Sequence, residues 1–237
     1  MGIRRGSITT GIIADGLVLN MDPANRASTI PSTSTTKTFN TLDTSISGSI
    51  ITDATWTNST ISPSFNFDGS DGYIDISTSQ TLPPNTNDFT LSGWFYRDSS
   101  SSGIPVYFEK GAAYPSNGIL IRDSGATGLI EIYYNGFGAI QFSNLTSYNT
   151  SNAWHHIALV YSESGDTLTA YVDGNSEQKP ATTTLNITDS IFIIGKRQNN
   201  TSYWYGNIGP AHIYNRALSA NEVLHNYNAL KGRFGLS

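Results

Sequence analysis

Cysteine is absent from this sequence of 237 residues, and charged side chains are scarce. Without cysteine the fold contains no disulfide, and no thiolate can act as a nucleophile or a zinc ligand. Asp, Glu, Lys and Arg make up 13% of the residues, against roughly 25% in an average soluble domain. Ser, Thr and Asn take their place, a composition typical of extracellular and virion β-proteins.

A surplus of positive charge and a long apolar run are also missing. The net charge is −5, and nucleic-acid binding requires a basic face, so nucleic acid is not an expected partner. No apolar run approaches the about 18 residues that span a bilayer. Gly and Asp interrupt the apolar residues that follow the arginines in "MGIRRGSITTGIIADG", so we expect no signal peptide and no membrane partner.

Apolar residues account for 38% of the chain and aromatic residues for 11%, enough for a buried core. They occur in short β-branched and aromatic runs, and Gly, Asn, Asp and Ser fill almost every gap. This pattern predicts an all-β fold, a two-sheet antiparallel jelly-roll sandwich. The runs lie at 16–22, 64–76, 89–96, 106–111, 118–123, 129–136, 139–145, 154–161, 167–172, 190–197 and 203–215.

The chain length fits one large all-β domain, which we place at residues 14–218, after an N-terminal arm at residues 1–13. Residues 24–62 are rich in Ser and Thr. They predict an ordered surface excursion of this domain, with a few edge strands.

Residues 219–237 contain the one good helix signal. Ser219 and Glu222 form a capping box, an apolar stripe follows at helical spacing, and Gly232 can end the helix. We expect a short C-terminal helix and tail whose stripe docks on the sandwich or on a neighbouring subunit.

Two of the four histidines are adjacent, in the strand-like run "WHHIALVY". Successive side chains of a strand point to opposite faces, so His155 and His156 cannot readily bind one metal ion. The alternation places Trp154 with His156 on one face and Ile157 with His155 on the other. We interpret the pair as structural, with one imidazole covering a sheet face and the other hydrogen-bonded inside the sheet.

Five stretches together resemble a known family: "SFNFDGSDGYIDI", "FTLSGWFY", "NAWHHIALVY", "LTAYVDGN" and "GNIGPAHIYNRALSANEV". They have the order and spacing of the laminin G-like branch of the concanavalin A-like lectin/glucanase superfamily, over roughly residues 12–235. The stretches "GLVLNMDPAN" and "YNRALSANEVLHNYNALKGRFG" resemble laminin G-like proteins of tailed-phage virions. The resemblance implies a jelly roll with one concave sheet and loops at its rim, whereas function has to be argued from the residues.

Glucanases of this superfamily use two carboxylates about 5 Å apart, placed on one strand face as Glu-x-Asp-x-x-Glu. No glutamate of this chain begins that pattern. The nearest pair on neighbouring predicted strands is Glu131 with Asp123, which we interpret as a solvated pair at the rim. The motifs of serine hydrolases, zinc proteases, P-loops and dinucleotide sites are also missing, so we expect no enzyme activity.

Calcium-assisted glycan binding is a second activity that the family suggests. Calcium takes clustered carboxylate and carbonyl oxygens, and the best candidates are Asp68 and Asp71 in "FDGSDGY". The alternative is that these aspartates only form a turn, because Asp-Gly is a common hairpin pair. In addition, Gly-Pro at 209–210 stands where the family often has an acidic pair, which removes possible oxygen ligands. No other cofactor is expected. Three more aspartates would join if the loops converge: Asp22, Asp123 and Asp173.

Exposed aromatic rings beside amides suit sugars, because a ring stacks on the apolar face of a sugar. The stretches "QNNTSYWYGN" and "EKGAAYPSNG" offer such sets. The opposing interpretation places Trp204 and one tyrosine in the core or at a subunit interface. The predicted ligand-binding residues are Tyr114, Asn117, Asn199, Asn200, Tyr203, Trp204 and Tyr205.

Together these features predict a non-enzymatic structural protein of a phage virion, displayed on the particle surface as a capsid decoration protein or fibre component. It would form a homo-oligomer in contact with other virion proteins, with a glycan of the host surface as a further partner. The alternative is a secreted or surface carbohydrate-binding lectin module assisted by calcium.

Overall fold

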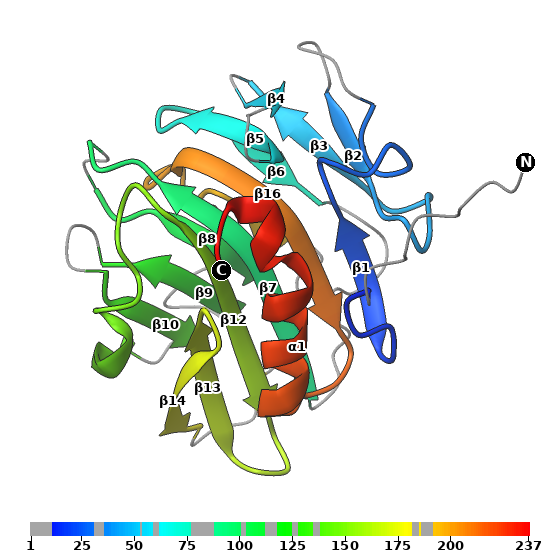
Figure 1. Cartoon of the computed structure of the whole chain (residues 1–237). Helices are drawn as coiled ribbons and strands as arrows, with labels where there is room; N and C mark the ends of the chain where they lie inside the picture. The colour runs from blue at the N-terminus through cyan, green and yellow to red at the C-terminus, as the bar shows by residue number, and fades with distance from the viewer. Residues whose placement is uncertain are drawn as a thin grey trace, which may run out of the picture.

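Two antiparallel sheets pack face to face, and one α-helix lies on the outside (Figure 1). A computed structural model describes residues 11–30, 36–52, 54–58, 62–76, 88–100, 103–111, 118–124, 128–134, 138–181, 185 and 192–237. Each sheet has eight strands in the described chain. The expected jelly-roll sandwich is therefore confirmed.

Sheet A contains the strands that position the candidate site. Its order is β14-β13-β12-β7-β16-β5-β4, and β1 pairs with the remaining part of β16. The bounds are β1 Leu17–Met21, β4 Thr55–Asn58, β5 Pro63–Asp68, β7 Asp88–Arg97, β12 Trp154–Ser162, β13 Thr167–Val172, β14 Asn175–Pro180 and β16 Tyr205–Tyr214.

Sheet B forms the second layer, in the order β11-β10-β9-β8-β15-β6-β3-β2. A short 3₁₀ turn, η1 (Ser143–Leu145), follows β11. The bounds are β2 Lys37–Phe39, β3 Ser47–Ile51, β6 Tyr73–Asp75, β8 Val106–Gly111, β9 Gly118–Asp123, β10 Ile130–Tyr134, β11 Ile140–Phe142 and β15 Phe192–Ile194.

The excursion at 24–62 takes part in both sheets. Its strands β2 and β4 are edge strands, as expected, whereas β3 lies inside sheet B between β6 and β2. Ile46, Ile50 and Ala54 from this segment are buried in the main core. The segment therefore completes the sandwich as well as covering its surface.

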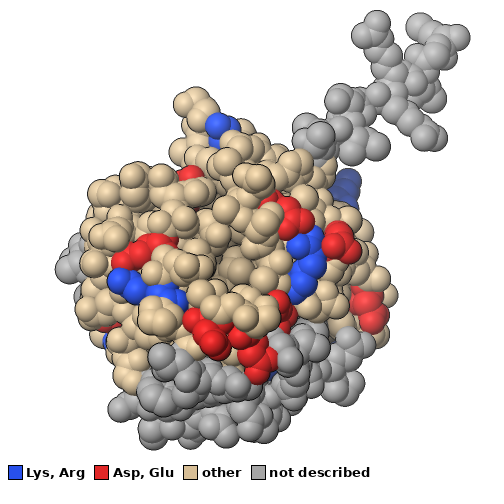
Figure 2. All heavy atoms as spheres, turned by 90° about the horizontal axis from the view of Figure 1, so that it is seen from below, with Lys and Arg blue, Asp and Glu red and all other residues tan. Residues whose placement is uncertain are grey.

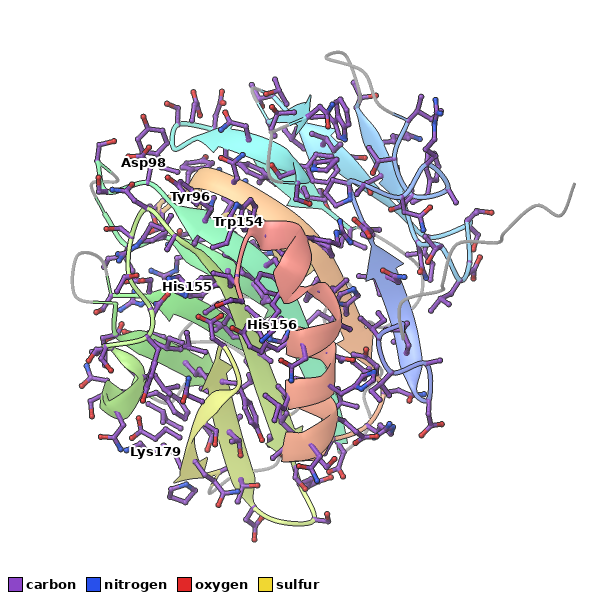
Figure 3. All side chains as sticks on the ribbon, in the orientation of Figure 1. Tyr96, Asp98, Trp154, His155, His156 and Lys179 are labelled. Atoms are coloured by element: carbon purple, nitrogen blue, oxygen red, sulfur yellow. The ribbon has the colours of Figure 1, made fainter. Side chains whose placement is uncertain are left out.

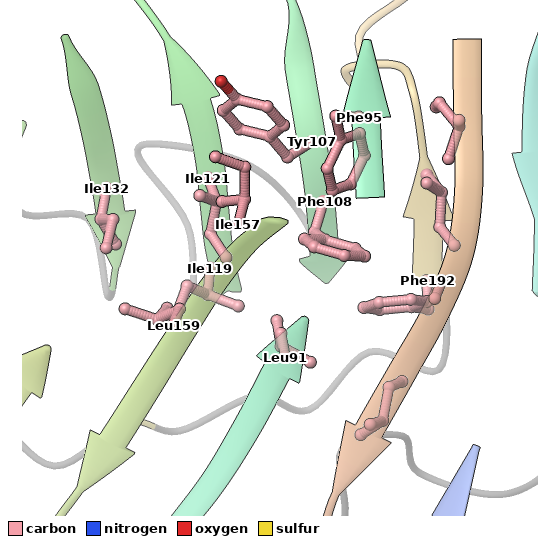
Figure 4. Close-up of a cluster of buried hydrophobic side chains, with 14 of the residues drawn as sticks. Leu91, Phe95, Tyr107, Phe108, Ile119, Ile121, Ile132, Ile157, Leu159 and Phe192 are labelled. Carbon is pink, nitrogen blue, oxygen red and sulfur yellow. The ribbon is translucent and has the colours of Figure 1, made fainter. Parts of the chain in front are cut away.

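Strict alternation along the strands builds the core between the sheets (Figure 4). On β7, Phe89, Leu91 and Phe95 point into that core, whereas Trp94 and Tyr96 belong to a separate cluster on the outer face of sheet A. The two faces of β7 follow from the alternation of successive side chains along a strand.

The helix α1 (Ala220–Lys231) lies across the outer face of sheet A (Figure 1). Its capping box of Ser219 and Glu222 is present as predicted. The 3₁₀ turn η2 (Gly232–Phe234) then places the Phe234 ring 4.2 Å from the Trp94 ring. The helix thus docks on its own sandwich. Among the described residues, no helix is long and apolar enough to cross a membrane.

Charged side chains are sparse on the surface. In the face seen from below, Lys and Arg lie beside Asp and Glu in small mixed groups, and most of the described surface is uncharged (Figure 2). Among the described residues, Arg216 forms ion pairs of 3.0 Å with Asp15 and 2.7 Å with Glu222. The low charge of the sequence is therefore a property of the surface.

Candidate functional site

A row of aromatic and polar uncharged side chains crosses the outer face of sheet A beyond the C-terminal end of α1. Five neighbouring strands each contribute one residue, and adjacent members are direct cross-strand partners. We call this row, together with Tyr205 and Asp68 beside it, the aromatic–amide platform. From β12 to β4 the row consists of Trp154, Tyr96, Asn207, Asn66 and Thr55.

Strand alternation explains why these polar side chains face outward. On β5, Phe65 and Phe67 are buried in the core, so Asn66 between them points to the other face. On β16, Ile208 is buried in the core and Asn207 points outward. The polar row is thus the solvent side of strands whose other side forms the core.

The amides of the platform are oriented by hydrogen bonds to each other. Asn66 donates from Nδ2 to Oδ1 of Asn207 over 3.1 Å, and Asn207 donates from Nδ2 to Oγ of Ser64 over 2.9 Å. Asn66 is exposed, and its side-chain oxygen Oδ1 accepts no hydrogen bond within the described chain. An amide offers two donors and one acceptor oxygen, so this row retains capacity for an external ligand.

Aromatic rings form the other end of the platform. The rings of Tyr96 and Trp154 are 5.8 Å apart and lie next to each other above the end of α1 (Figure 3). Trp154 is buried against the ring of Phe234, 4.6 Å away, whereas Tyr96 is only half-buried. Tyr96 therefore offers a ring edge or face to a ligand on a rigid support.

Two of the predicted site residues reach the platform. Tyr205 and Asp68 are direct partners across β16 and β5. Tyr205 is half-buried and Asp68 is exposed. Gly69 follows with a φ of +79°, and a Cβ atom there would lie 3.0 Å from Cβ of Tyr205, so glycine permits this close turn.

Trp204 does not belong to a surface site, which corrects its prediction as a ligand contact. Its side chain is 1% exposed, and its ring lies 5.3 Å from Phe95 and 5.1 Å from Tyr107 in the core. Tyr205 points to the outer face of sheet A, so the preceding residue, Trp204, points into the core. The core interpretation of Trp204 is confirmed.

The other predicted ligand residues that the structure describes are not brought onto the platform. Asn199 and Asn200 are exposed in a turn, where Oδ1 of Asn199 accepts hydrogen bonds from Thr201. Tyr203 is half-buried, with its ring 5.8 Å from Nζ of Lys196. Tyr114 and Asn117 lie outside the described residues.

A buried carboxylate, that of Glu109, is hydrogen-bonded to the segment that leads into the turn of Asn199 and Asn200. Glu109 on β8 is 1% exposed, and Oε2 accepts a hydrogen bond from the backbone N–H of Gln198. Burial raises the pKa of Glu109 to about 7, although the Gln198 N–H and the charges of Arg197 and Lys196 lower it. At neutral pH this group is therefore only partly ionised.

The structure corrects the interpretation of Glu131 and Asp123 as a solvated pair. Ile130 is the cross-strand partner of Asp123 and Arg122 that of Glu131, so the two acids point to opposite faces of sheet B. Asp123 is paired with Arg97 at 3.2 Å and Glu131 with Arg122 at 2.7 Å, and both acids are buried. These two carboxylates cannot act on one glycosidic bond.

The predicted calcium ligands lie in the turn between β5 and β6. Oδ1 of Asp68 accepts a hydrogen bond of 2.8 Å from the backbone N–H of Ser70, as in an Asx turn. Among the residues that the structure describes, no three His, Asp or Glu side chains come together as a metal site. Asp68 and Asp71 therefore have no third carboxylate in that part of the chain.

The histidine pair is arranged as the alternation predicts. Nδ1 of His155 lies 2.7 Å from Oδ2 of Asp173 and its Nε2 lies 3.2 Å from the hydroxyl of Thr150. His156 is buried on the opposite face, with its ring 5.4 Å from Trp94 beneath α1. One imidazole is hydrogen-bonded and the other covers a sheet face, so the structural interpretation is confirmed.

The two packed antiparallel sheets define a β-sandwich domain of the concanavalin A-like type. Residues 68–224 match the family described as the Concanavalin A-like lectin/glucanases superfamily, through its Laminin_G_3 model. The chain therefore belongs to this laminin G-like family. No curated protein sequence matches the chain significantly.

Solved structures with the same fold include a sialidase and a neurotoxin domain. Trypanosoma rangeli sialidase in complex with sialic acid is 14% identical, with a TM-score of 0.63, over 91% of this chain and 33% of that chain. The binding domain of botulinum neurotoxin serotype D is 13% identical, with a TM-score of 0.65, over 90% of this chain and 52% of that chain. At these identities the likeness shows the fold alone, and this chain spans about a third and about half of those two chains.

Proposed function

We propose that this protein is a non-catalytic binding module that recognises carbohydrate through the aromatic–amide platform. The observation that carries the proposal is the row from Tyr96 through Asn207 to Asn66, in which a half-buried ring adjoins oriented amides on a rigid sheet. Sugars present an apolar face and a hydroxyl edge, which a ring and amides complement. The lectin/glucanase family supports the same ligand class.

A particle-surface location is the finer part of this proposal. The phage-like stretches at both ends and the uncharged surface favour a virion decoration or fibre protein that presents the platform outward, as a homo-oligomer among other virion proteins. Labelling the chain in purified phage particles and locating it by electron microscopy tests this location. Particles without the labelled chain would count against it.

Replacing Tyr96 by Ala is expected to weaken glycan binding about tenfold, which corresponds to about 1.4 kcal/mol. The loss follows from removal of the stacking ring, while the amide row remains. The measurement is a glycan array followed by titration of the best ligand, each with and without a chelator. Loss of binding with the chelator would indicate that binding requires calcium, with Asp68 and Asp71 as the candidate ligands.

Tyr148→Ala is the matched control, because Tyr148 is 43% exposed and lies outside the platform. It should bind as the unmodified protein does. Equal binding by the Tyr96→Ala variant, with its fold verified by circular dichroism, would contradict the proposal. Trp204→Ala is unsuitable as a binding test, since it removes a core side chain and should cost about 3–5 kcal/mol of stability.

A further inference from the structure

Two acidic side chains border the platform at Tyr205. Asp68 is exposed beside Tyr205, and the backbone N–H of Asp98 donates to the carbonyl oxygen of Tyr205 over 3.1 Å, which places a second acid at this edge. Hydrogen bonds from the Ser100 side chain and N–H lower the pKa of Asp98, so it stays ionised at neutral pH. The five residues of the row itself include no basic side chain.

Arg233, a basic side chain near the platform, is paired with an acid. Arg233 donates from Nη1 and Nη2 to the two carboxylate oxygens of Asp22, over 2.8 and 2.9 Å. On the side of the platform, Nη2 of Arg233 lies 3.5 Å from Oγ of Ser62, a long contact. Ser62 is two residues before Ser64, which accepts the hydrogen bond from Asn207. A bidentate pair of this kind leaves little positive charge for an anionic ligand.

The platform also has a closed end and an open end. Trp154 closes one end, since it is buried against Phe234 from the C-terminal turn. At the other end Thr55 is exposed on β4, the edge strand of sheet A. Three strand spacings separate Tyr96 from Thr55, a distance of about 14 Å.

We propose that the platform selects a short uncharged oligosaccharide, lying across the strands from Thr55 to Tyr96, and discriminates against sialylated and uronic-acid glycans. This inference rests on the proposed function and adds the ligand class. An anionic sugar would meet the negative charges of Asp68 and Asp98, whereas hydroxyl groups find the amides of Asn66 and Asn207. The buried end at Trp154 limits the number of sugar units that make contact.

The test is an array of neutral, sialylated and uronic-acid oligosaccharides at low salt, followed by calorimetric titration with the full chain. Neutral ligands are expected to bind at least about fivefold more tightly than their acidic counterparts, and the difference should shrink at 1 M NaCl, where the screening length is about 3 Å. Affinity should rise with ligand length and level off when the ligand spans about 14 Å.

Asp68→Lys provides the sharpest variant, because it reverses the charge at the exposed partner of Tyr205. It should raise the affinity for acidic glycans and so reduce the ratio of neutral to acidic affinity. Asp166→Asn, at an exposed turn where asparagine tolerates the positive φ of 48°, is the matched control and should change neither.

The outcomes separate this inference from the proposed function. A preference for sialylated ligands that still depends on Tyr96 would overturn the inference and leave carbohydrate binding intact. A neutral preference that neither Asp68→Lys nor salt alters would also overturn it. No binding to any glycan would end both proposals.

Discussion

Replacing Asp123 by Ala is expected to lower the free energy of unfolding by about 3–5 kcal/mol. Asp123 is fully buried, and its carboxylate is the acceptor at the centre of a polar network that joins the two sheets at one end. Without it the buried guanidinium of Arg97 loses the ion pair of 3.2 Å to Asp123. Breaking a buried ion pair by removing one partner is strongly destabilising.

The geometry of the network supports a large effect. Arg97 on β7 lies 3.2 Å from Oδ1 of Asp123 on β9, and Asn149 donates to Oδ2 over 2.9 Å. Asn149 also lies 2.9 Å from the hydroxyl of Tyr107 on β8. Burial and the negative charge of Asp123 hold the pKa of Tyr107 well above 10, so its hydroxyl stays protonated.

The matched control is the exposed acid Asp15, whose side chain is 87% exposed and pairs with Arg216 at 3.0 Å. Asp15→Ala should change stability by less than about 1 kcal/mol. Denaturant unfolding of both variants gives the comparison, and a similar small loss for Asp123→Ala would contradict the prediction. The double variant Arg97→Met with Asp123→Leu should recover part of the loss, since neither charge remains buried.

Local alternation was sufficient to predict the faces of the strands. The side chains of β12 from Trp154 to Ile157 fall on the predicted sides, because burial of one face fixes the register. The sequence does not predict β14 and β3 as individual strands. Their sequences, "NSEQKP" and "SGSII", lack a clear apolar alternation, and pairing with neighbouring strands determines their conformation.

The candidate site was harder to predict than the fold because its members are distant in sequence. Tyr96, Asn207 and Asn66 come together through the pairing of β7, β16 and β5, and no local pattern specifies which strands are neighbours. Alternation in "SFNFD" and "YGNI" does indicate that the two asparagines face outward. The site could not be predicted because the sequence does not show the order of the strands in the sheet.

Charged strand residues show the same limit. Asp123 and Glu131 were interpreted as solvated because the sequence shows no partner for either. Their partners Arg97 and Arg122 lie on neighbouring strands or on the opposite sheet. A buried ion pair between layers is visible only once the layers are known.

Acid is expected to destabilise the protein from pH 6.5 downward through two buried histidines. Burial lowers the pKa of His156 to about 3 and that of His212 to about 4, from 6.5. The charge of His212 further lowers the pKa of His156. For His212 itself, the charge of Asp22 raises the pKa and that of Arg233 lowers it. As pH falls below 6.5, the unfolded chain binds two protons that the folded chain excludes, so folding becomes less favourable.

Glu109 acts in the opposite direction. Its pKa of about 7 in the folded chain, against 4.5 ordinarily, means that the folded state holds an extra proton between these values. Two histidine protons minus one Glu109 proton leave one, so stability should rise with pH by about 1.4 kcal/mol per unit between pH 4.5 and 6.5. Below pH 4.5 the offset disappears, but His212 then begins to bind a proton in the folded chain, so the slope should stay at about 1.4 kcal/mol per unit down to about pH 4.

Two variants with opposite expected effects test this account. His156→Phe keeps a flat ring between Trp94 and Tyr227 and should make stability nearly independent of pH in that window. Glu109→Gln should roughly double the slope, to about 2.7 kcal/mol per pH unit. The measurement is the free energy of unfolding from urea titrations at several pH values, where a uniform loss of stability shifts the curve without changing its slope. Parallel curves for His156→Phe and the unmodified protein would mean that His156 is charged when buried, and the pH dependence would need another source.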